Sequence, residues 1–469
     1  MRPSRVRVGS RDRVISDIVS TRLDMDSDRK PYFVLPTNGG LEGADLSEIL
    51  EGEVVECLSS TRMSVLNQMG WNRDSVIRGL GDGSLSRFSQ KDLLKLLDRK
   101  NACLGITGGG DCAGISDCLA SFAQNLRRDK VMLGVQNASE GLAMPPELFD
   151  DNLILVDSLV RADMFGRGST PFGSSRKNAF DHESQHVLDN VRDFGAVYGT
   201  GGNGGLAMLE RIAAAFPEEC VVGTFKSIDG DGLIDGRPTQ MLGFNTAVRA
   251  NRHAVYDIAQ SAFAHGTVDV VEVFGRNYGR LAFESARHDT LAVADEGRDL
   301  KRKIEELGQI MLILIPEKPA SMRDIAEEVL ARKKKFRSCV IVVAEGFVPT
   351  DYANGTHGKV SDLIADGLKE FAGLNKVNVT TQTRQARGTR PSYYDRAMGL
   401  KIGKKMAELV NEGVVGGRAV VYFEGVDAMQ NDPEVVDLHG VSQGSTLLSL
   451  HSDDELRKGG VFWRESMAA

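Results

Sequence analysis

Short apolar runs alternate with segments of helical periodicity along most of the chain, and this alternation limits the fold more than any other feature. A first set includes ACLGIT (102–107) and CVVGTF (220–225), with helical patterns such as LAMLERIAAAF (206–216) between its runs. A second set begins at VDVVEVFG (268–275) and ends with CVIVVAEG (339–346). Strands and helices that alternate imply a parallel sheet covered by helices on both faces. The sequence therefore predicts an α/β protein built from two halves.

The first 98 residues lack this alternation, and we expect them to form an N-terminal extension that packs on the main body. The chain has 469 residues, of which 41% are hydrophobic and 26% charged, as in a folded globular protein. Its net charge of −8 provides no basic surface for nucleic acid. The sequence contains no apolar run of 18 residues that could cross a membrane, and its basic start lacks the apolar core of a secretory signal. We expect a cytoplasmic protein without nucleic-acid or membrane partners.

Two glycine-rich loops follow apolar runs and precede helical patterns, at 107–114 (TGGGDCAG) and 199–205 (GTGGNGG). Glycine lets the backbone approach a phosphate closely, and the start of the next helix offers free N–H groups. Both loops are therefore candidate phosphate sites. Their spacing also fits a dinucleotide fingerprint loosely, but an acid about 20 residues further on is missing, because Gln136 and Asn137 follow the next apolar run.

A third loop, GTFKSIDGDGLI (223–234), holds charges of both signs between glycines. Asp229 and Asp231 are two residues apart, so in an extended segment their carboxylates point the same way, with Lys226 near the same end. A surface turn would explain the DGDG sequence equally well in isolation. The presence of three such loops after apolar runs favours a shared site.

These loops belong to an ordered series that resembles the 6-phosphofructokinase family over roughly three quarters of the chain. The matching blocks are TGGGDCAG, FGRGSTPFGSSR, YGTGGNGG, GTFKSIDGD, GFNTA, VVEVFGRNYGRLA, VVAEG and RQARGTRPSYYDRAMGLKIG. The resemblance implies two Rossmann-like halves with an active site in the cleft between them, in a homo-oligomer, a dimer or tetramer. It also implies Mg²⁺-dependent transfer of a phosphoryl group from ATP or pyrophosphate to the 1-hydroxyl group of fructose 6-phosphate.

The resemblance also implies that each half of the main body binds one of the two substrates. Residues 99–246 and 386–440 are expected to form the half that binds the phosphoryl donor. Residues 247–385 and 441–469 are expected to form the half that binds the sugar phosphate.

The donor site implied by the resemblance contains residues from all three loops. Asp229 matches the catalytic base, and Asp231 matches a companion acid that orients the sugar or the magnesium ion. Arg176 matches an arginine that bridges the donor phosphates, and Lys226 and Arg276 are further cations of the catalytic centre. The residues expected around the donor phosphates and the metal are Gly109, Gly110, Gly202, Asn203, Gly204 and Gly205, with Asn203 and Asp231 as metal ligands.

The sugar site is implied by blocks of the second half. Phe274, Gly275 and Arg276 match a Met-Gly-Arg motif that contacts the substrate, with phenylalanine in place of methionine. Glu345 matches a carboxylate that accepts sugar hydroxyl groups, and Arg387 matches an arginine that binds the sugar phosphate. Ser227 and Arg384 complete the expected substrate contacts.

The choice of donor depends on two positions. Pyrophosphate-using relatives carry an aspartate where this chain has Gly204, which leaves the space for the α-phosphate of a nucleotide open. Lys226 points the other way, because pyrophosphate users have lysine there, although some ATP users combine this lysine with that glycine. We expect ATP as the donor, with pyrophosphate as the alternative.

Several departures from the family raise the alternative of a catalytically inactive regulatory relative. Asn203 replaces a magnesium-binding aspartate and so removes a negative charge. Ser227 and Gly230 replace a threonine and an asparagine beside the base, which predicts a looser loop. Thr267 and Asn378 stand where many relatives have arginines that bind the 6-phosphate across a subunit interface, and neither side chain can replace a guanidinium. If Arg384 does not resupply that charge, the acceptor is another sugar or sugar phosphate, or catalysis is weak.

Overall fold

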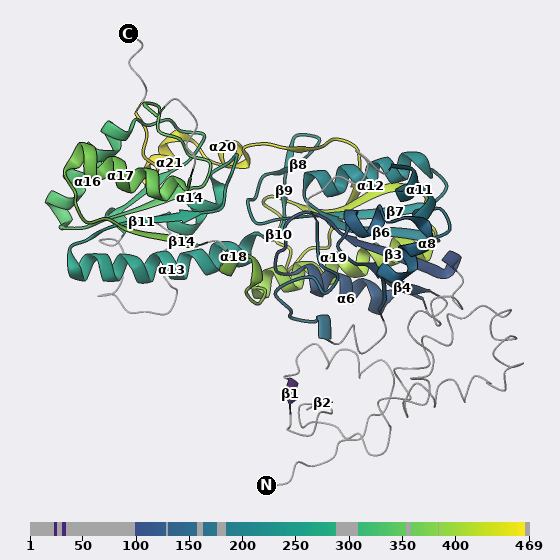
Figure 1. Ribbon diagram of the computed structural model, residues 1–469. Coiled ribbons are helices and arrows are strands. Elements are labelled where there is room, and N and C mark those ends of the chain that lie inside the picture. The colour runs from purple at the N-terminus through teal and green to yellow at the C-terminus, as the bar shows by residue number, and fades with distance from the viewer. Residues whose placement is uncertain are drawn as a thin grey trace, which may run out of the picture.

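The main body of the protein folds into two α/β lobes that lie side by side (Figure 1). The computed structural model describes residues 99–127, 130–156, 163–175, 184–287, 308–352, 358–382 and 384–464. It also describes two short antiparallel strands, β1 (Leu23–Met25) and β2 (Pro31–Phe33). The rest of the predicted N-terminal extension lies outside the described residues. The two-lobed α/β fold confirms the predicted fold class.

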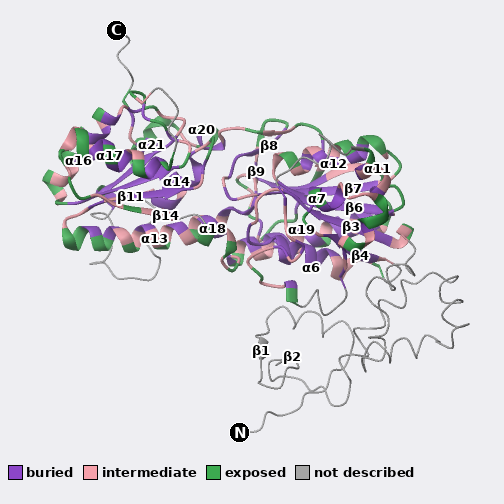
Figure 2. Cartoon of the chain, viewed as in Figure 1, coloured by how far each residue is buried: buried purple, intermediate pink, exposed green. Residues whose placement is uncertain are grey.

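The first lobe is built on a large mixed sheet whose central strands are parallel. The described residues give the strand order β17-β8-β9-β15-β7-β6-β3-β4-β5, with β10 beside β7 and β16 beside β15. The parallel strands are β3 (Ala102–Thr107), β4 (Val131–Val135), β6 (Ala196–Gly201), β7 (Cys220–Ser227), β10 (Leu242–Gly243) and β15 (Gly416–Phe423). The antiparallel strands are β5 (Leu153–Leu155), β8 (Gly232–Ile234), β9 (Arg237–Gln240), β16 (Glu434–Asp437) and β17 (Val441–Gln443). The central strands are buried along almost their whole length (Figure 2), which explains their continuous apolar sequences.

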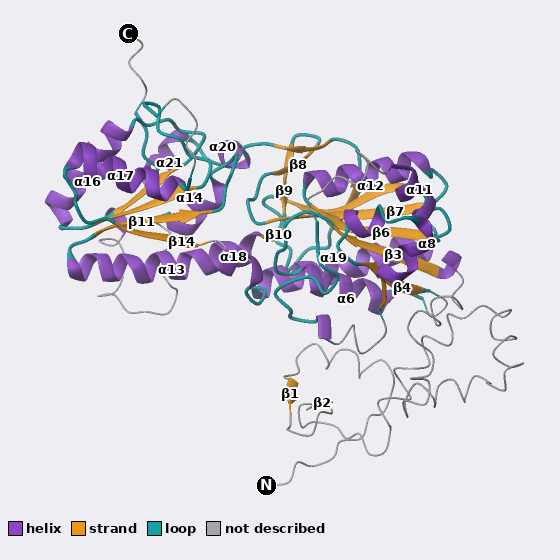
Figure 3. Ribbon diagram, viewed as in Figure 1, coloured by secondary structure: helices purple, strands orange, loops and turns teal. Residues whose placement is uncertain are grey.

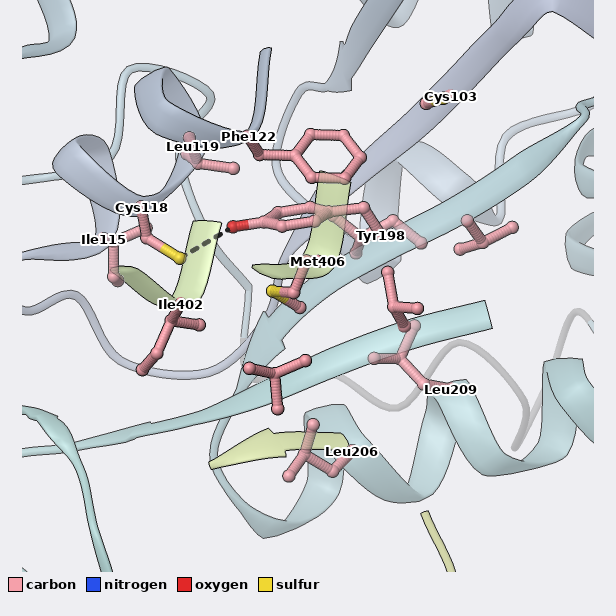
Figure 4. Packing of buried hydrophobic residues seen from close by; sticks show 14 of the residues in the cluster. Cys103, Ile115, Cys118, Leu119, Phe122, Tyr198, Leu206, Leu209, Ile402 and Met406 are labelled. Carbon is pink, nitrogen blue, oxygen red and sulfur yellow. Dashed lines mark hydrogen bonds between the residues drawn. The ribbon is translucent and has the colours of Figure 1, made fainter. Parts of the chain in front are cut away.

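Helices cover both faces of this sheet (Figure 3). The longer ones are α6 (Ile115–Asn125), α11 (Ser184–Val191), α12 (Asn203–Ala215) and α19 (Tyr393–Glu412). Short turns of helix are α7 (Ser139–Leu142), α8 (Pro146–Phe149), η2 (Arg99–Asn101) and η3 (Asp150–Asn152). Helices α6 and α19 approach each other closely at Gly403 of α19. A Cβ atom there would lie only 2.2 Å from the Cys118 carbonyl oxygen of α6, so a larger residue would not fit. Beneath this contact, the Tyr198 hydroxyl group donates a hydrogen bond to Cys118 Sγ over 3.2 Å (Figure 4).

The second lobe contains a smaller sheet in which all four described strands are parallel, in the order β12-β13-β11-β14. These strands are β11 (Val268–Val273), β12 (Met311–Leu314), β13 (Cys339–Ala344) and β14 (Asn378–Gln382). One face packs against α13 (Phe244–His265), α14 (Arg280–Ala286), α20 (Thr446–Leu450) and α21 (Asp453–Lys458). The other face packs against α16 (Met322–Phe336) and α17 (Val360–Ala372). Alternate residues of β11, β12 and β13 therefore enter two separate cores.

The chain passes between the lobes three times. The first passage is α13, the second runs from β14 through α18 (Arg384–Gly388) into α19, and the third is the segment 444–446. The predicted boundary at residue 441 differs from the structure, because β17 pairs with β8 in the sheet of the first lobe. No helix in the described ranges is both long and apolar enough to span a membrane.

Candidate active site

A cavity of about 630 Å³ lies where the loops of the two lobes face each other. Its walls are formed by loops that follow β3, β6 and β7 of the first lobe and β11 and β13 of the second. Ligands of parallel α/β sheets bind at the carboxyl ends of the strands, so this is the expected place for a site. The charged side chains on its walls are Lys226, Asp229, Asp231, Glu272, Arg276, Glu345, Lys359 and Arg387.

The two glycine-rich loops form one wall of the cavity and pack backbone against backbone. A Cβ atom on Gly108 of the first loop would lie 3.5 Å from the Cα atom of Gly205 in the second, and Gly109 has a φ of +80°. The Gly108 N–H group donates a hydrogen bond to the Thr200 carbonyl oxygen over 2.9 Å. Glycines at these positions therefore let the backbones of the two loops lie in direct contact.

All five glycines predicted around the donor phosphates line this wall, and so does Asn203 at the start of α12. The glycines are Gly109, Gly110, Gly202, Gly204 and Gly205. A Cβ atom on Gly204 would have no other atom within 4 Å, so the space next to it is open. Arg176, the predicted bridge between the donor phosphates, lies outside the described residues.

The loop between β7 and β8 brings both aspartates to the cavity. The Asp229 N–H group donates to Ser227 Oγ over 3.1 Å, and the Ser227 hydroxyl group donates to Asp231 Oδ1 over 3.2 Å. Gln443 Nε2 donates to Asp231 Oδ2 over 3.0 Å. Both oxygens of the Asp231 carboxylate therefore accept hydrogen bonds. Burial raises the pKa of Asp231, and the hydrogen bonds from its own backbone and from Ser227 oppose part of that effect.

Lys226 lies at the end of β7 with only 3% of its surface exposed. Its ammonium group donates a hydrogen bond to the Gly110 carbonyl oxygen. This contact joins the loop after β3 to the strand that leads to Asp229. A positive charge therefore lies beneath the glycine loops.

Residues of the second lobe provide the opposite wall. Phe274 and Arg276 follow β11, and Glu345 follows β13, where its N–H group donates to the Val273 carbonyl oxygen over 2.9 Å. Arg387 of α18 stacks 4.1 Å above the centre of the Phe274 ring. Its Nη1 atom also donates to the Asp111 carbonyl oxygen of the first lobe over 3.2 Å. The phenylalanine that replaces the family's methionine thus supports an arginine on the wall of the site.

Two predicted substrate contacts do not reach the cavity wall. Gly275 has a φ of +133°, and a Cβ atom there would lie 2.6 Å from the Tyr278 carbonyl oxygen, so it shapes the turn that presents its neighbours. Arg384 is exposed on α18 and does not line the cavity. The structure therefore does not support Arg384 as a source of charge in the site.

The two positions that lack family arginines lie at the other end of the second sheet. Thr267 precedes β11 and Asn378 begins β14, so both are at the amino ends of strands whose carboxyl ends face the cavity. Both side chains donate to the Asp269 carboxylate, over 2.6 and 2.9 Å respectively. They form a small polar cluster and contribute nothing to the cavity wall.

Several residues of the cavity wall were not predicted from the sequence. Glu272 is buried on β11, and its Oε2 atom accepts hydrogen bonds from the N–H and hydroxyl groups of Ser361 at the start of α17. This contact fixes the helix end that brings Lys359 to the cavity. The sequence could have indicated Glu272 as a site residue, because it is a carboxylate near the end of the largely apolar run VDVVEVFG (268–275). Gln443 gave no such signal, because it lies in a short polar strand far along the chain.

The fold and this cavity define a two-lobed α/β protein with glycine loops facing charged side chains, the arrangement of a phosphotransferase. The chain belongs to the phosphofructokinase family, which it matches over residues 103–410. It is thus a sugar-phosphate phosphotransferase of the phosphofructokinase type, as the resemblance predicted.

Relatives with both kinds of phosphoryl donor are similar to the chain. ATP-dependent 6-phosphofructokinase 1 of Synechocystis sp. is 28% identical over 337 residues, which cover 66% of this chain and 84% of the relative. Pyrophosphate--fructose 6-phosphate 1-phosphotransferase of Streptomyces coelicolor is 28% identical over 348 residues, which cover 69% and 91%. These similarities alone do not distinguish the donor.

Solved structures share the fold. Pyrophosphate-dependent phosphofructokinase from Nitrosospira multiformis superposes with a TM-score of 0.59 at 18% identity, over 74% of this chain and 86% of that one. Phosphofructokinase from Saccharomyces cerevisiae superposes with a TM-score of 0.56 at 21% identity, over 72% and 45%.

Proposed function

We propose that the protein transfers the γ-phosphoryl group of ATP to the 1-hydroxyl group of fructose 6-phosphate or a related sugar phosphate. The observation that carries this proposal is that Asp229 lines the same cavity as the glycine loops of the first lobe and Arg276 of the second. The names of the relatives supply the substrate class, since both include a fructose 6-phosphate or phosphofructokinase activity.

The first lobe is proposed to bind the donor. Backbone N–H groups at the glycine loops and at the start of α12 suit a phosphate chain. Lys226 adds positive charge beneath them, and Arg176 remains a prediction for a residue that bridges the phosphates. Open space beside Gly204 leaves room for a nucleotide, which supports ATP.

The second lobe is proposed to bind the acceptor, with Asp229 of the first lobe as general base. Asp229 takes the proton of the attacking hydroxyl group. The oxygen of that hydroxyl group bonds to the γ-phosphorus while the bond from this phosphorus to the departing ADP oxygen breaks. Asp231, fixed by Ser227 and Gln443, orients the attacking group. Arg276 and Arg387 supply charge for phosphate oxygens, and Glu345 suits the hydroxyl groups of a sugar.

Magnesium neutralises charge on the transferred phosphates when it is bound. In the part of the chain that the structure describes, no three metal-ligating side chains cluster together. Mg²⁺ keeps several water ligands and needs only one or two protein carboxylates besides the phosphates. The Asp231 carboxylate and the Asn203 amide both line the cavity, so these residues would hold the ion.

A coupled assay with ATP and with pyrophosphate, in Mg²⁺ and over a panel of sugar phosphates, tests the proposal. Turnover of fructose 6-phosphate or a close analogue with ATP is the expected result. Turnover with pyrophosphate alone would instead establish the pyrophosphate-dependent activity. Nucleotide binding without turnover of any acceptor would favour an inactive regulatory relative, the candidate that Asn203 supports.

The state of assembly and the compartment are also proposals. We expect a homo-oligomer, a dimer or tetramer, as the resemblance implies, and we expect it in the cytoplasm. Light scattering of the purified protein measures the first of these.

A further inference from the structure

A buried arginine joins the second lobe to the loop that carries the two aspartates. Arg280 is the first residue of α14 in the second lobe. Its Nη2 atom lies 2.7 Å from Oε1 of Glu424, which follows β15 in the first lobe. The two side chains are only 7% and 19% exposed. This ion pair therefore crosses between the lobes in a place that is largely shielded from water.

The same guanidinium group reaches the backbone between Asp229 and Asp231. Arg280 Nη1 lies 3.3 Å from the carbonyl oxygen of Gly230, to which it donates. It also donates to Thr446 Oγ1 over 3.2 Å, and the Thr446 hydroxyl group itself donates to the Gly230 carbonyl oxygen. Thr446 begins α20, whose neighbouring Leu447 is part of the core of the second lobe. One carbonyl group of the aspartate loop is thus bound by two residues of the opposite lobe.

Packing leaves the loop little freedom at this point. Gly230 has a φ of +70°, and a Cβ atom there would lie 2.7 Å from the Phe244 ring and 3.0 Å from Arg280 Cδ. Arg280 Cζ lies 4.6 Å from the centre of the Phe244 ring. The sequence predicted a looser loop because glycine replaces asparagine here, and the structure shows the opposite: Gly230 is enclosed and its carbonyl group is bound.

Contacts with the other lobe, rather than the stability of helix α14, explain why an arginine stands at position 280. A cation at the first turn of a helix is opposed by the helix dipole, and a buried ion pair is often no more stabilising than apolar residues of similar size. Neither local helix stability nor global stability accounts for an arginine at this site. Its contacts with Glu424 and Gly230 do, because they fix the aspartate loop relative to the second lobe.

We propose that Arg280 is a positioning residue that holds the Asp229–Asp231 loop against the second lobe through the carbonyl group of Gly230. The proposal rests on the proposed function, in which Asp229 must lie close to an acceptor bound by the second lobe. A shift of a reacting group by about 1 Å can cost about a hundredfold in rate. Loss of Arg280 should therefore lower kcat while substrate binding is retained.

A double variant distinguishes a positioning role of Arg280 from a purely structural role in which Arg280 only neutralises Glu424. Arg280→Met alone leaves the Glu424 carboxylate buried and unpaired, which by itself destabilises the protein. Arg280→Met combined with Glu424→Gln removes that penalty but leaves the Gly230 carbonyl group without its guanidinium donor. Arg287→Met serves as the matched control, since Arg287 follows the same helix and pairs with Glu284 of the same lobe.

The experiment compares full-length wild type, Arg280→Met, Arg280→Met/Glu424→Gln and Arg287→Met. We expect the double variant to regain most of the thermal stability that the single variant loses. Its kcat should stay about tenfold or more below wild type, with each KM within about threefold. A double variant whose kcat returns to within about twofold of wild type would overturn the proposal, because Arg280 would then only neutralise Glu424. If the single variant does not fold, the double variant decides alone.

Hydrogen exchange of the amides in residues 227–234 provides a readout that needs no turnover. Faster exchange in both Arg280 variants, but not in Arg287→Met, is expected. Unchanged exchange in the double variant would refute the positioning role. A wild-type protein without phosphoryl transfer would refute the proposed function separately, and the exchange data would still decide the role of Arg280.

Discussion

Gln443 Nε2 donates a hydrogen bond to Oδ2 of Asp231 over 3.0 Å and so joins the last strand of the first sheet to the loop after β7. The two residues are 212 positions apart. Gly444 reinforces this contact, because its N–H group donates to the Asp231 carbonyl oxygen over 3.0 Å. The carboxylate next to the proposed base is therefore oriented by a C-terminal segment.

Gln443→Met should lower kcat by roughly fivefold, the effect of losing one hydrogen bond worth about 1 kcal/mol. The methionine keeps the volume of the side chain but cannot donate to Asp231. Steady-state kinetics measure the change, with the exposed Gln430→Met as control. An unchanged kcat would mean that Ser227 alone is enough to orient the carboxylate.

Gly230→Ala should destabilise the protein by about 1–3 kcal/mol, because alanine adopts a positive φ at a cost and its Cβ atom collides with Phe244. Gly236→Ala is a matched control, since Gly236 has a similar φ of +74° and open space around its Cβ position. Urea denaturation of both variants separates the cost of the positive φ, which both share, from the cost of the collision with Phe244, which only Gly230→Ala meets. Equal losses of stability would show that backbone strain, rather than enclosure, determines the result.

Gly204→Asp should raise the KM for ATP by about tenfold or more while the protein keeps its stability, because open space surrounds this position. The added carboxylate fills the region proposed for the α-phosphate and repels it. Gly204→Ala controls for size without charge. Undiminished use of ATP by the aspartate variant would place the nucleotide elsewhere.

Asp395 should make stability depend on pH. It is fully buried at the start of α19, and burial raises the pKa of its carboxyl group to about 6 from 3.8, although hydrogen bonds from Thr246 oppose the shift. Because the pKa is higher in the folded state, the stabilising contribution is complete below pH 3.8 and is lost as the pH rises through about 6.

Urea unfolding of wild type and Asp395→Asn across this pH range measures the effect. The difference in unfolding free energy, wild type minus variant, should fall as the pH rises and then become constant. The exposed Asp366→Asn serves as control. Parallel curves for wild type and Asp395→Asn would contradict the prediction.

The sequence predicted the buried strands well because their environment leaves a strong signal. Run 339–344 is apolar throughout and run 102–107 is apolar up to its last residue, and they coincide with β13 and β3, which are buried on both faces. Strands β8, β9 and β17 were not predicted, because all three are short and because β9 and β17 also carry polar residues. The lobe boundary near residue 441 was misplaced for the same reason.

The candidate site was predictable where residues follow buried strands. Asp229, Gly109 and Arg276 occupy such positions and line the cavity. Gln443 and Arg280 act through partners distant in the sequence, and one sequence carries no record of those contacts. Arg384 was expected to resupply the charge of the missing arginines, but it is exposed at the first position of α18 and does not line the cavity.

The most direct test of the account is the rate of phosphoryl transfer by Asp229→Asn with ATP, Mg²⁺ and fructose 6-phosphate. Asp235→Asn, in the exposed turn between β8 and β9, is the control for loss of an aspartate from the same segment. We predict that kcat falls by about two to four orders of magnitude in Asp229→Asn, with nucleotide binding retained, and is unchanged in the control. Wild-type turnover in Asp229→Asn would contradict the assignment of Asp229 as the base.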